Sequence, residues 1–380
     1  MARKVLFLTL KVFGFTGGIE KVCRIICRAL YDLSVEEVAD PAVYSMYDKY
    51  YDRDSKYLKK SQYHAFDGNR KRFVLRSLFK GITSDVVILS HIHLLSVGYL
   101  IKRFRPSTKV YLLAHGIEIW RKLPEAKLKA LRRLDKIIAV SQYTADMIED
   151  IHEIDSGKIE ILNNCLDPFY YYPQQFEKPE FLLKRHGLHE NQTILFSLSR
   201  LSSSEKYKGY DHTFEILSHL IKKKPELMYV LAGKYDTEEK RRLDKLIAKF
   251  RIEKHVKLIG FVDEAEITDY FLLSDIFIMP SKKEGFGIVF IEAMASGLRV
   301  IAGNKDGSVD ALKQGELGKL VDPDNLSEIE GALIDLLDHP INTEEKLALQ
   351  AKVFHAFNYE KYRESIRNAI LCGTTYFCFI

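Results

Sequence analysis

Short apolar runs alternate with amphipathic segments along almost the whole 380-residue sequence, and this alternation restricts the fold more than any other feature. Continuous apolar runs bounded by polar residues are typical of strands that are buried on both faces of a parallel sheet. The segments between them, such as residues 19–30 and 126–134, have the spacing of helices that pack on such a sheet. The sequence therefore predicts an α/β fold with parallel, doubly wound sheets. The predicted strands are residues 5–10, 86–89, 110–114, 137–140, 159–162, 194–198, 228–232, 256–259, 276–279 and 300–302.

One stretch, residues 163–179, interrupts the alternation. It contains an aromatic run and three prolines, Pro168, Pro173 and Pro179. Because proline is unfavourable in helix interiors and in central strands, we interpret this stretch as an interdomain linker. A chain of 380 residues is long enough for two hydrophobic cores. We therefore predict two Rossmann-like domains, at residues 1–170 and 181–356.

A second irregular stretch, residues 40–68, is rich in Tyr, Asp and Lys. A long insertion in an α/β domain is usually a surface loop, often near a binding site. A solvated loop with one or two strands of its own explains the same composition equally well.

Basic residues are concentrated in the first half of the chain. The formal net charge is +5, but residues 1–180 hold 29 Lys and Arg against 22 Asp and Glu. Such asymmetry indicates an anionic partner for the first half. Residues 69–80 and 121–136 mix Lys and Arg with Leu, so each can be a basic helix on anionic lipid or an ordinary solvated helix face. Nucleic acid is not expected as a partner, because the charges accompany no recognised binding motif.

The cysteines and the apolar runs predict a cytoplasmic protein. The run 5–10 is too short for the core of a signal peptide, and the run 86–101 contains His91, His93 and Gly98, which favours a strand and then a helix over a membrane span. The cysteines show no metal-ligand or redox spacing, and buried free thiols in a reducing compartment are expected. They are Cys23, Cys27, Cys165, Cys372 and Cys378.

Candidate functional residues follow the predicted strands, because doubly wound folds bind ligands beyond the carboxyl ends of their strands. Gly17 and Gly18 follow the first strand and precede a helix, so the backbone there can approach a ligand and offer N–H groups to a phosphate. An ordinary tight turn explains the two glycines equally well, and the spacing of the dinucleotide fingerprint Gly-x-Gly-x-x-Gly is absent. His115 follows the third of these strands and precedes Gly116, which suits a residue that faces a cleft, although a lone His is more often structural.

Two cations follow the first strand of the second half. Arg200 lies at the strand end and Lys208 at the start of the next helix, and such a pair can hold a diphosphate without a metal ion. A solvated basic loop is the equally supported alternative.

A block from Pro280 to Gly297 carries two glutamates, Glu284 and Glu292, on either side of a helix start near Gly287. The free N–H groups of Gly287 and Ile288 favour an anion. A carboxylate accepts hydrogen bonds from vicinal hydroxyls, so the two acids suit a sugar ligand. Surface acids without a role are the alternative, which the apolar residues around Glu292 disfavour.

With these motifs the sequence resembles glycosyltransferase family 4, whose fold is GT-B, two Rossmann-like domains that face each other across a cleft. The resemblance spans most of the chain and is densest at residues 200–323. Its carriers are the two glycines and His115-Gly116 of the first half, Val140-Ser141, Arg200 with Lys208-Gly209, Gly260-Phe261-Val262, the glutamate block with Ala-Met-Ala-Ser-Gly, and residues 302–307.

The resemblance implies a retaining glycosyltransferase that moves a sugar from a UDP- or GDP-linked donor to a glycan or to a lipid-linked acceptor of the lipopolysaccharide or capsule type. It implies no metal and no cofactor. Arg200 and Lys208 would hold the donor diphosphate, Glu292 the ribose and Glu284 the donor sugar. The backbone of Gly287, Ile288 and Val289 would contact phosphate and sugar, Val262 the base, and His115 the reacting centre. The segment from about 357 to 380 would join the first, acceptor-side domain.

Two departures and one alternative accompany the resemblance. The Arg-to-Lys loop is extended by residues 202–207, so Lys206 competes with Lys208, which we prefer because a glycine follows it. The apolar tail 371–380 has no counterpart in the motifs.

A sugar-nucleotide-binding or epimerising protein on the same scaffold is the alternative function, since a fold alone does not define an activity. A nicotinamide dehydrogenase is disfavoured by the missing glycine fingerprint.

Overall fold

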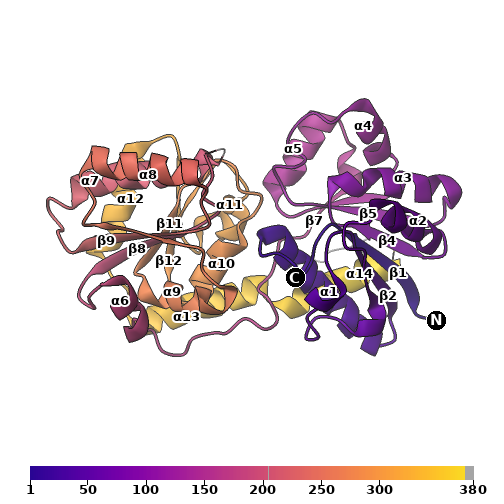
Figure 1. Cartoon of the computed structure of the whole chain (residues 1–380), viewed down its shortest axis with the longest axis horizontal. Coiled ribbons are helices and arrows are strands. Elements are labelled where there is room, and N and C mark those ends of the chain that lie inside the picture. The colour runs from indigo at the N-terminus through magenta and orange to yellow at the C-terminus, as the bar shows by residue number, and fades with distance from the viewer. Residues whose placement is uncertain (204, 373–380) are drawn as a thin grey trace. The chain divides into compact units, whose positions relative to one another are not determined.

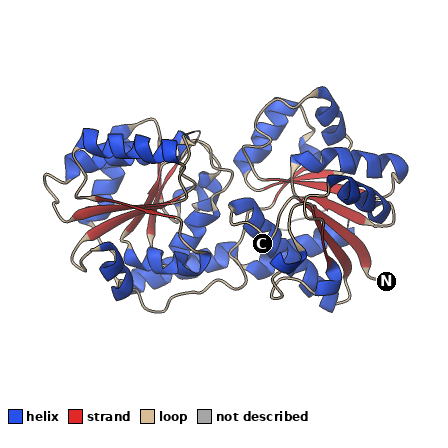
Figure 2. Cartoon of the chain, in the orientation of Figure 1, coloured by secondary structure: helices blue, strands red, loops and turns tan. Residues whose placement is uncertain are grey.

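The computed structural model, which describes residues 1–203 and 205–372 apart from the side chain of Lys206, contains two parallel sheets covered by helices (Figures 1 and 2). Each sheet is the centre of one structural unit. The first unit comprises Met1–Pro168 and the segment from Asn358, and the second comprises Phe169–Phe357. The chain leaves the first unit inside the proline-rich stretch that the sequence marks as a linker.

The sheet of the first unit has the strand order β3-β2-β1-β4-β5-β6-β7. The five strands expected in this half are confirmed, with ends that differ by at most two residues. The order reverses between β1 and β4, which is the switch point at which doubly wound folds bind ligands. The strands are β1 (Arg3–Thr9), β2 (Ala39–Ser45), β3 (Tyr63–Ala65), β4 (Val86–Leu89), β5 (Lys109–Ala114), β6 (Lys136–Ala139) and β7 (Ile159–Ile161). The helices are α1 (Gly18–Val35), α2 (Arg70–Gly81), α3 (Leu95–Phe104), α4 (Glu125–Arg132), α5 (Gln142–His152) and α14 (Tyr359–Cys372), with short 3-10 helices η1 (Tyr50–Asp52), η2 (Lys60–Gln62), η3 (Ile92–Leu94) and η4 (Ser156–Lys158).

The expectation of a surface loop at residues 40–68 is wrong at both ends of the stretch, which form β2 and β3. All seven residues of β2 pair with β1, and the last three also pair with β3. At Pro41, β2 pairs with β1 but not with β3. The missing N–H of Pro41 therefore removes no hydrogen bond to β3. The alternative, a loop with one or two strands of its own, agrees better with the structure, except that β2 and β3 belong to the main sheet.

The sheet of the second unit has the order β10-β9-β8-β11-β12-β13. The five expected strands are again confirmed, and the short strand β13 is an addition that the sequence did not predict. The strands are β8 (Thr193–Leu198), β9 (Leu227–Ala232), β10 (Val256–Gly260), β11 (Ile276–Met279), β12 (Arg299–Gly303) and β13 (Lys319–Val321). The helices are α6 (Glu180–His186), α7 (Tyr210–Leu220), α8 (Thr237–Phe250), α9 (Ile267–Leu273), α10 (Ile288–Ala295), α11 (Ser308–Ala311), α12 (Leu326–Asp338) and α13 (Thr343–Phe357), with 3-10 helices η5 (Lys206–Lys208), η6 (Glu264–Glu266) and η7 (Lys313–Gly315).

Helix α14 completes the core of the first unit, although the whole second unit separates it from the rest of that unit in sequence. It packs on α1 and β1. Its buried side chains include Tyr362, Ile366 and Ile370. Tyr359 Oη donates to Asp32 of α1 at 2.6 Å, and Tyr111 Oη of β5 donates to the carbonyl of Ala369 at 3.2 Å.

The apolar run 86–101 forms β4, η3 and the start of α3, as the sequence predicts. None of the helices in the described part of the chain combines the length and the apolar character that a membrane span requires. Cys23, Cys27 and Cys165 are buried free thiols, and Cys372 is exposed. Cys378, and with it residues 373–380 of the apolar tail, lies outside the described residues.

Candidate functional site

The carboxyl ends of all six parallel strands lie at one edge of the second sheet, and the candidate residues of this unit lie along it. The loops after β8, β9 and β10 are joined through their backbones. Ser199 N donates to the carbonyl of Ala232 at 3.1 Å, and Gly233 N donates to the carbonyl of Gly260 at 2.7 Å. A Cβ on Gly233 would lie 1.8 Å from the carbonyl oxygen of Ser199, so this close approach requires glycine. The edge is therefore a continuous wall of tightly packed loops.

Lys208 and Glu284 form an ion pair at the centre of this edge, with Nζ 2.5 Å from Oε2. Gly209, with a φ of +85°, makes the pair possible, because a Cβ there would lie 2.4 Å from the carbonyl oxygen of Pro280. Lys282 N also donates to the carbonyl of Tyr207 at 2.9 Å. The structure thus brings together two residues that are 76 positions apart in sequence, and it explains the Lys-Gly dipeptide.

Arg200 lies in the same loop as Lys208 and pairs with a residue of that loop. Its Nη2 atom is 2.8 Å from Oε1 of Glu205. Tyr207 hydrogen bonds with Glu205, and burial together with this carboxylate raises the pKa of the Tyr207 hydroxyl well above its usual value. Sequence reasoning missed both Glu205 and Tyr207, because they belong to the extension of the loop rather than to a motif.

Asp306, which follows β12, braces the loop that carries Glu284. Its Oδ2 accepts from Ser281 Oγ at 2.6 Å and from Glu284 N at 2.8 Å, while Oδ1 accepts from Ser308 N at 2.9 Å. Gly307 N donates in turn to the carbonyl of Glu284 at 2.8 Å. Burial raises the pKa of Asp306 to about 6. The sequence contains this residue in the segment 302–307, but only the adjacency of β11 and β12 gives it a contact with Glu284.

Helix α10 begins at Ile288 with Gly287 as its N-cap, as predicted. Gly287 has a φ of +84°, and a Cβ there would lie 2.4 Å from the ring of Phe290. Glu292 is only 3% exposed, so the alternative of a surface acid is wrong for this residue. Its carbonyl accepts from Tyr170 Oη at 2.7 Å, which fixes the linker tyrosine to the helix. Val289 is partly exposed on the same helix.

Val262 lies at the far end of the same edge. It follows β10, which is two strands away from β8 and Arg200 in the sheet. Its side chain is buried, whereas the neighbouring Phe261 is exposed. Gly260, at the end of β10, has a φ of +73° and turns the chain into this loop. Val262 therefore shares this edge of the sheet with the other candidates of the second unit.

A pocket of about 130 Å³ lies at the switch point of the first unit, between the ends of β1 and β4. It is lined by Leu10, Lys11, Ile19, Glu20, Ser90 and His91. Gly17 is the N-cap of α1 and Gly18 its first residue, as the sequence suggests. The Glu20 carboxylate approaches this helix start so closely that a Cβ on Gly17 would lie 2.5 Å from Oε2.

The N–H groups of the loop after β1 have a protein partner. The buried carboxylate of Asp48 accepts from Val12 N at 2.8 Å, Phe13 N at 3.1 Å and Gly14 N at 3.2 Å. It also accepts from Tyr63 Oη at 2.9 Å. Asp48 therefore already occupies the N–H groups of Val12, Phe13 and Gly14, which are not available to a ligand.

His115 borders the pocket through Ser90. Its Nε2 is 3.0 Å from the carbonyl oxygen of Ser90, and its backbone N donates to Glu118 Oε1 at 2.6 Å. Burial lowers the pKa of the His115 imidazole to about 4, so the ring is neutral at pH 7. Because a carbonyl only accepts, the ring proton lies on Nε2 and the lone pair on Nδ1. A neutral His with a free lone pair can accept a hydrogen bond from a hydroxyl group.

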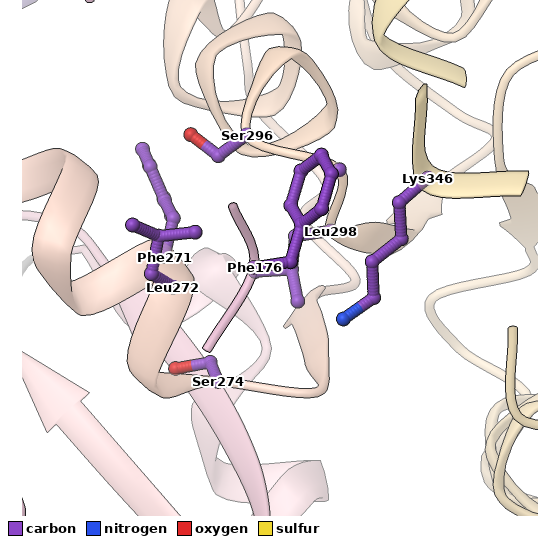
Figure 3. Close-up of a pocket in the computed structure, with 8 residues that line it drawn as sticks. Phe176, Phe271, Leu272, Ser274, Ser296, Leu298 and Lys346 are labelled. Atoms are coloured by element: carbon purple, nitrogen blue, oxygen red, sulfur yellow. The ribbon is translucent and has the colours of Figure 1, made fainter. Parts of the chain in front are cut away.

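A further small cavity of the second unit lies elsewhere (Figure 3). Its volume is about 10 Å³, which is room for about one water molecule. Phe176 and Lys346 line it together with Ser274, two residues before β11, and Leu298, directly before β12. It therefore lies at the amino ends of these strands, opposite the edge described above.

No group of three or more His, Cys, Asp or Glu side chains suited to a metal ion occurs in the part of the chain that the structure describes.

Comparison with protein families matches both units. The model described as "Glycosyltransferase Family 4" matches residues 16–168, and the model described as "Glycosyl transferases group 1" matches residues 179–354. Together the two matches cover most of the chain.

Two curated relatives illustrate the range of similar sequences. The GDP-mannose-dependent alpha-(1-6)-phosphatidylinositol monomannoside mannosyltransferase of Mycobacterium tuberculosis is 30% identical over 247 residues, which are 62% of this chain and 62% of the relative. The 2-deoxystreptamine N-acetyl-D-glucosaminyltransferase of Niallia circulans is 24% identical over 203 residues, which are 53% of this chain and 50% of the relative. The match thus spans less than two thirds of the length of these relatives.

Solved structures with the same fold match nearly the whole chain. HepE of Anabaena in complex with UDP has a TM-score of 0.78 at 20% identity, with 97% of this chain and 99% of that chain covered. The apo form of WaaB, a lipopolysaccharide outer core galactosyltransferase, has a TM-score of 0.70 at 15% identity, with 98% and 100% covered. At these identities the likeness establishes the fold alone, which is GT-B.

Proposed function

Since the chain belongs to glycosyltransferase family 4, we propose that it is a retaining glycosyltransferase, which moves a sugar from a nucleoside diphosphate donor to a hydroxyl of a glycan or lipid-linked acceptor. The observation that carries the proposal is the cluster of Arg200, Lys208 and Glu284 at the carboxyl edge of the second sheet. Two cations beside a carboxylate suit a ligand that joins a diphosphate to a sugar. UDP or GDP is the expected leaving group.

In the proposed reaction the bond between the anomeric carbon and the diphosphate oxygen breaks, and the acceptor oxygen bonds to the same face of that carbon. The acceptor proton passes to the departing phosphate oxygen. Arg200, Lys208 and the N–H groups at the start of α10 stabilise the charge that develops on the diphosphate, so no metal ion is required. Glu284 binds hydroxyls of the donor sugar and Glu292 those of the ribose. The buried position of Glu292 favours such a fixed acceptor of hydrogen bonds.

Gly287, Ile288 and Val289 contribute backbone contacts to phosphate and sugar in this proposal. Val262 lies beside the base at the other end of the edge. On the acceptor side, Gly17 and Gly18 border the pocket at the start of α1, and the lone pair of His115 accepts a hydrogen bond near the reacting centre. The proximity of His115 to Ser90, which lines that pocket, supports this role.

The test is donor binding and turnover in an Arg200→Ala variant. Loss of one charge-stabilising donor costs about 3–4 kcal/mol in the transition state, so turnover should fall by about 100- to 1000-fold. Lys222→Ala, which removes an exposed lysine in the turn after α7, is the matched control and should keep its activity. Turnover within a few fold of wild type in Arg200→Ala would reject the assignment. Release of nucleoside diphosphate without any glycosylated product would instead favour the binding or epimerising alternative.

We also propose a peripheral location on the inner face of the cell membrane, in contact with anionic lipid, through α2. Its Leu75 and Phe79, one turn apart, are 57% and 62% exposed, and the exposed Arg72 and Arg76 accompany them. The helix contains no acidic residue. Exposed apolar and basic side chains on one helix suit the boundary between lipid headgroups and acyl chains. The names of the mycobacterial relative and of WaaB refer to phosphatidylinositol monomannoside and to lipopolysaccharide, which fits a membrane-bound acceptor.

Sedimentation with lipid vesicles tests this surface. Wild type should bind vesicles that contain phosphatidylglycerol and ignore vesicles of phosphatidylcholine alone, and Leu75→Ser with Phe79→Ser should abolish the binding. Leu347→Ser, at a comparably apolar exposed position on α13 of the other unit, should leave it unchanged. Binding that does not depend on anionic lipid, or that survives the double variant, would remove this proposal.

A further inference from the structure

Arg200, the cation proposed above for the donor diphosphate, is held by a carboxylate of its own loop. The two side chains are joined by the 2.8 Å contact between Nη2 of Arg200 and Oε1 of Glu205. Arg200 is 72% exposed, whereas Glu205 is 14% exposed. The carboxylate is thus embedded in the protein and the guanidinium is accessible. If the pair separates, Arg200 is the member that can turn towards a ligand.

The local backbone fixes Glu205. Its N donates to the carbonyl of Ser202 at 2.8 Å, and its carbonyl accepts from Lys208 N at 3.2 Å. Tyr207 adds a side-chain hydrogen bond. The second oxygen of the carboxylate, Oε2, is buried and has no hydrogen-bond partner among the described atoms. A buried carboxylate with incomplete hydrogen bonding depends on a nearby cation, and Arg200 supplies it.

Lys208, the second proposed cation, is paired in the same way with Glu284 at 2.5 Å. Tyr207 is close to both pairs, because its ring centre is 5.5 Å from Lys208 Nζ and its hydroxyl hydrogen bonds with Glu205. Both cations therefore already have a carboxylate partner from their own unit. A diphosphate that binds to Arg200 and Lys208 must therefore displace the carboxylates of Glu205 and Glu284.

We propose that Glu205 is a displaceable internal substitute for the donor diphosphate, which neutralises Arg200 in the absence of donor and yields it when the donor binds. The inference rests on the proposed function, because it presupposes that Arg200 meets the diphosphate. Glu205 is a positioning residue that acts through Arg200. After transfer it takes Arg200 back, which weakens the hold on the nucleoside diphosphate and assists its release.

Removal of the competing carboxylate should therefore tighten binding. In Glu205→Gln, the dissociation constant of UDP or GDP, measured by calorimetry, should fall about three- to fivefold, which is the size expected for loss of one partly exposed ion pair. The KM for the sugar donor should fall by a similar factor. Inhibition by the product nucleoside diphosphate should become stronger.

The salt dependence of binding separates this role from a purely structural one. In wild type, the diphosphate replaces the ion pair of Arg200 with Glu205 by an ion pair of Arg200 with phosphate. The dissociation constant should therefore change little with salt. In Glu205→Gln, Arg200 is unpaired before binding, so added salt should weaken binding more steeply. A residue that only shapes the loop would leave this slope unchanged.

Three further variants control the interpretation. Glu226→Gln removes one exposed acid in the turn before β9 and should not alter binding, which accounts for the change in net charge. In the double variant Arg200→Ala with Glu205→Gln, the tightening should be lost, because Glu205 acts through Arg200. Glu205→Asp retains the charge but moves the carboxylate one methylene away from Arg200, so it should also tighten binding. This variant replaces Glu205→Gln in the test if Glu205→Gln does not fold.

The outcomes are distinguishable. If wild type binds and Arg200→Ala weakens binding, but Glu205→Gln and Glu205→Asp bind equally or more weakly, the inference is wrong and the proposed function stands. If wild type binds neither UDP nor GDP, or if Arg200→Ala binds as well as wild type, the proposed function fails and the inference fails with it. Tightening in the Glu205 variants that depends on Arg200 supports both.

Discussion

At the scale of single residues, the two units use buried ionisable groups in opposite ways. In the second unit, Asp306 is enclosed by the donors of Ser281, Glu284 and Ser308 and so holds the Glu284 loop in place. In the first unit, His115 is kept neutral beside the carbonyl of Ser90. The carboxylate of Asp306 fixes the loop that carries Glu284, whereas the neutral imidazole of His115 offers a lone pair.

The lowered pKa of His115 predicts a pH dependence of stability. Its folded value of about 4 lies below the value of about 6.5 expected for the unfolded chain. Between these values the unfolded state binds more protons, so the stabilisation is complete above pH ~6.5 and is lost as the pH falls towards 4. The free energy of unfolding of wild type, relative to His115→Gln, should decrease by about 2–3 kcal/mol over this range.

Fluorescence of Trp120 provides the measurement. This residue is the only Trp of the chain and lies in the first unit, in the loop after His115, so its signal reports the unfolding of that unit. Denaturant titrations at several pH values should show the two curves converging below pH 6.5. A wild-type curve that stays parallel to that of His115→Gln between pH 7 and 4 would contradict the pKa of His115.

Only some residues of the candidate site could be identified from sequence. Arg200, Lys208 and Glu284 were identified from their motifs, and the structure shows that Lys208 and Glu284 are in contact. Glu205 could not be recognised, because its role depends on how the extended loop folds back onto Arg200. Asp306 was visible as part of a motif, but its partners lie on a neighbouring strand end and become adjacent only in the sheet. Asp48 was missed for the same reason.

At the scale of elements, the helix and loop that carry the site depend on glycines whose conformation other residues rarely adopt. Gly209 permits the approach of the Lys208 loop to Pro280, and Gly287 starts α10 without a clash with Phe290. Both have positive φ values. Substitution at either position is therefore expected to disturb the site before it disturbs the sheet.

Gly209→Ala should be destabilising by about 1–3 kcal/mol, because a positive φ and a 2.4 Å contact with the Pro280 carbonyl both oppose a Cβ. Affinity for the nucleoside diphosphate should fall with it, since Lys208 is displaced. Gly331→Ala is the matched control. Gly331 is exposed within α12 with nothing near its Cβ position, so this change should stabilise by about 0.5–1 kcal/mol. Equal effects of the two substitutions on calorimetric stability would show that the backbone at Gly209 is not constrained.

Most elements could be predicted because their strands are continuous apolar runs. The exceptions have physical reasons. The start of β2 carries Asp40 and Pro41, which read as loop residues, and its burial comes from β1 beside it. Strands β3 and β13 have only three residues each, and neither has the isoleucines at both ends that made the equally short β7 recognisable. Pairing with a longer strand stabilises such short segments, and this pairing is a property of the sheet rather than of the segment.

At the scale of the whole molecule, the first unit is built from both ends of the described chain. The prolines of the linker identified the passage between the units, whereas the closing helix at about residues 359–370 was expected only from the resemblance to a family. The unit to which that helix belongs followed only from the resemblance to a family. Local sequence carries no information on which core a terminal helix completes, because that depends on the groove left by α1 and β1.

Ile366→Ala in α14 should destabilise the first unit by about 2–5 kcal/mol, since Ile366 is fully enclosed in that core. The midpoint of the Trp120 fluorescence transition in denaturant should fall accordingly. Leu333→Ala, an equally buried change in α12 of the second unit, should move this signal much less. A larger shift of the Trp120 transition in Leu333→Ala than in Ile366→Ala would mean that α14 is not part of the core of the first unit.

The late position of α14 also sets an order of events during synthesis on the ribosome. The second unit is complete once Phe357 has been added, whereas the first unit, though begun earlier, lacks a wall until the residues of α14 follow. At about 5–20 residues per second, roughly 10–40 s pass between the synthesis of Pro168 and that of Cys372. During this interval the apolar surface of α1 and β1 on which α14 packs is uncovered, and transiently exposed apolar surface favours aggregation of the nascent chain.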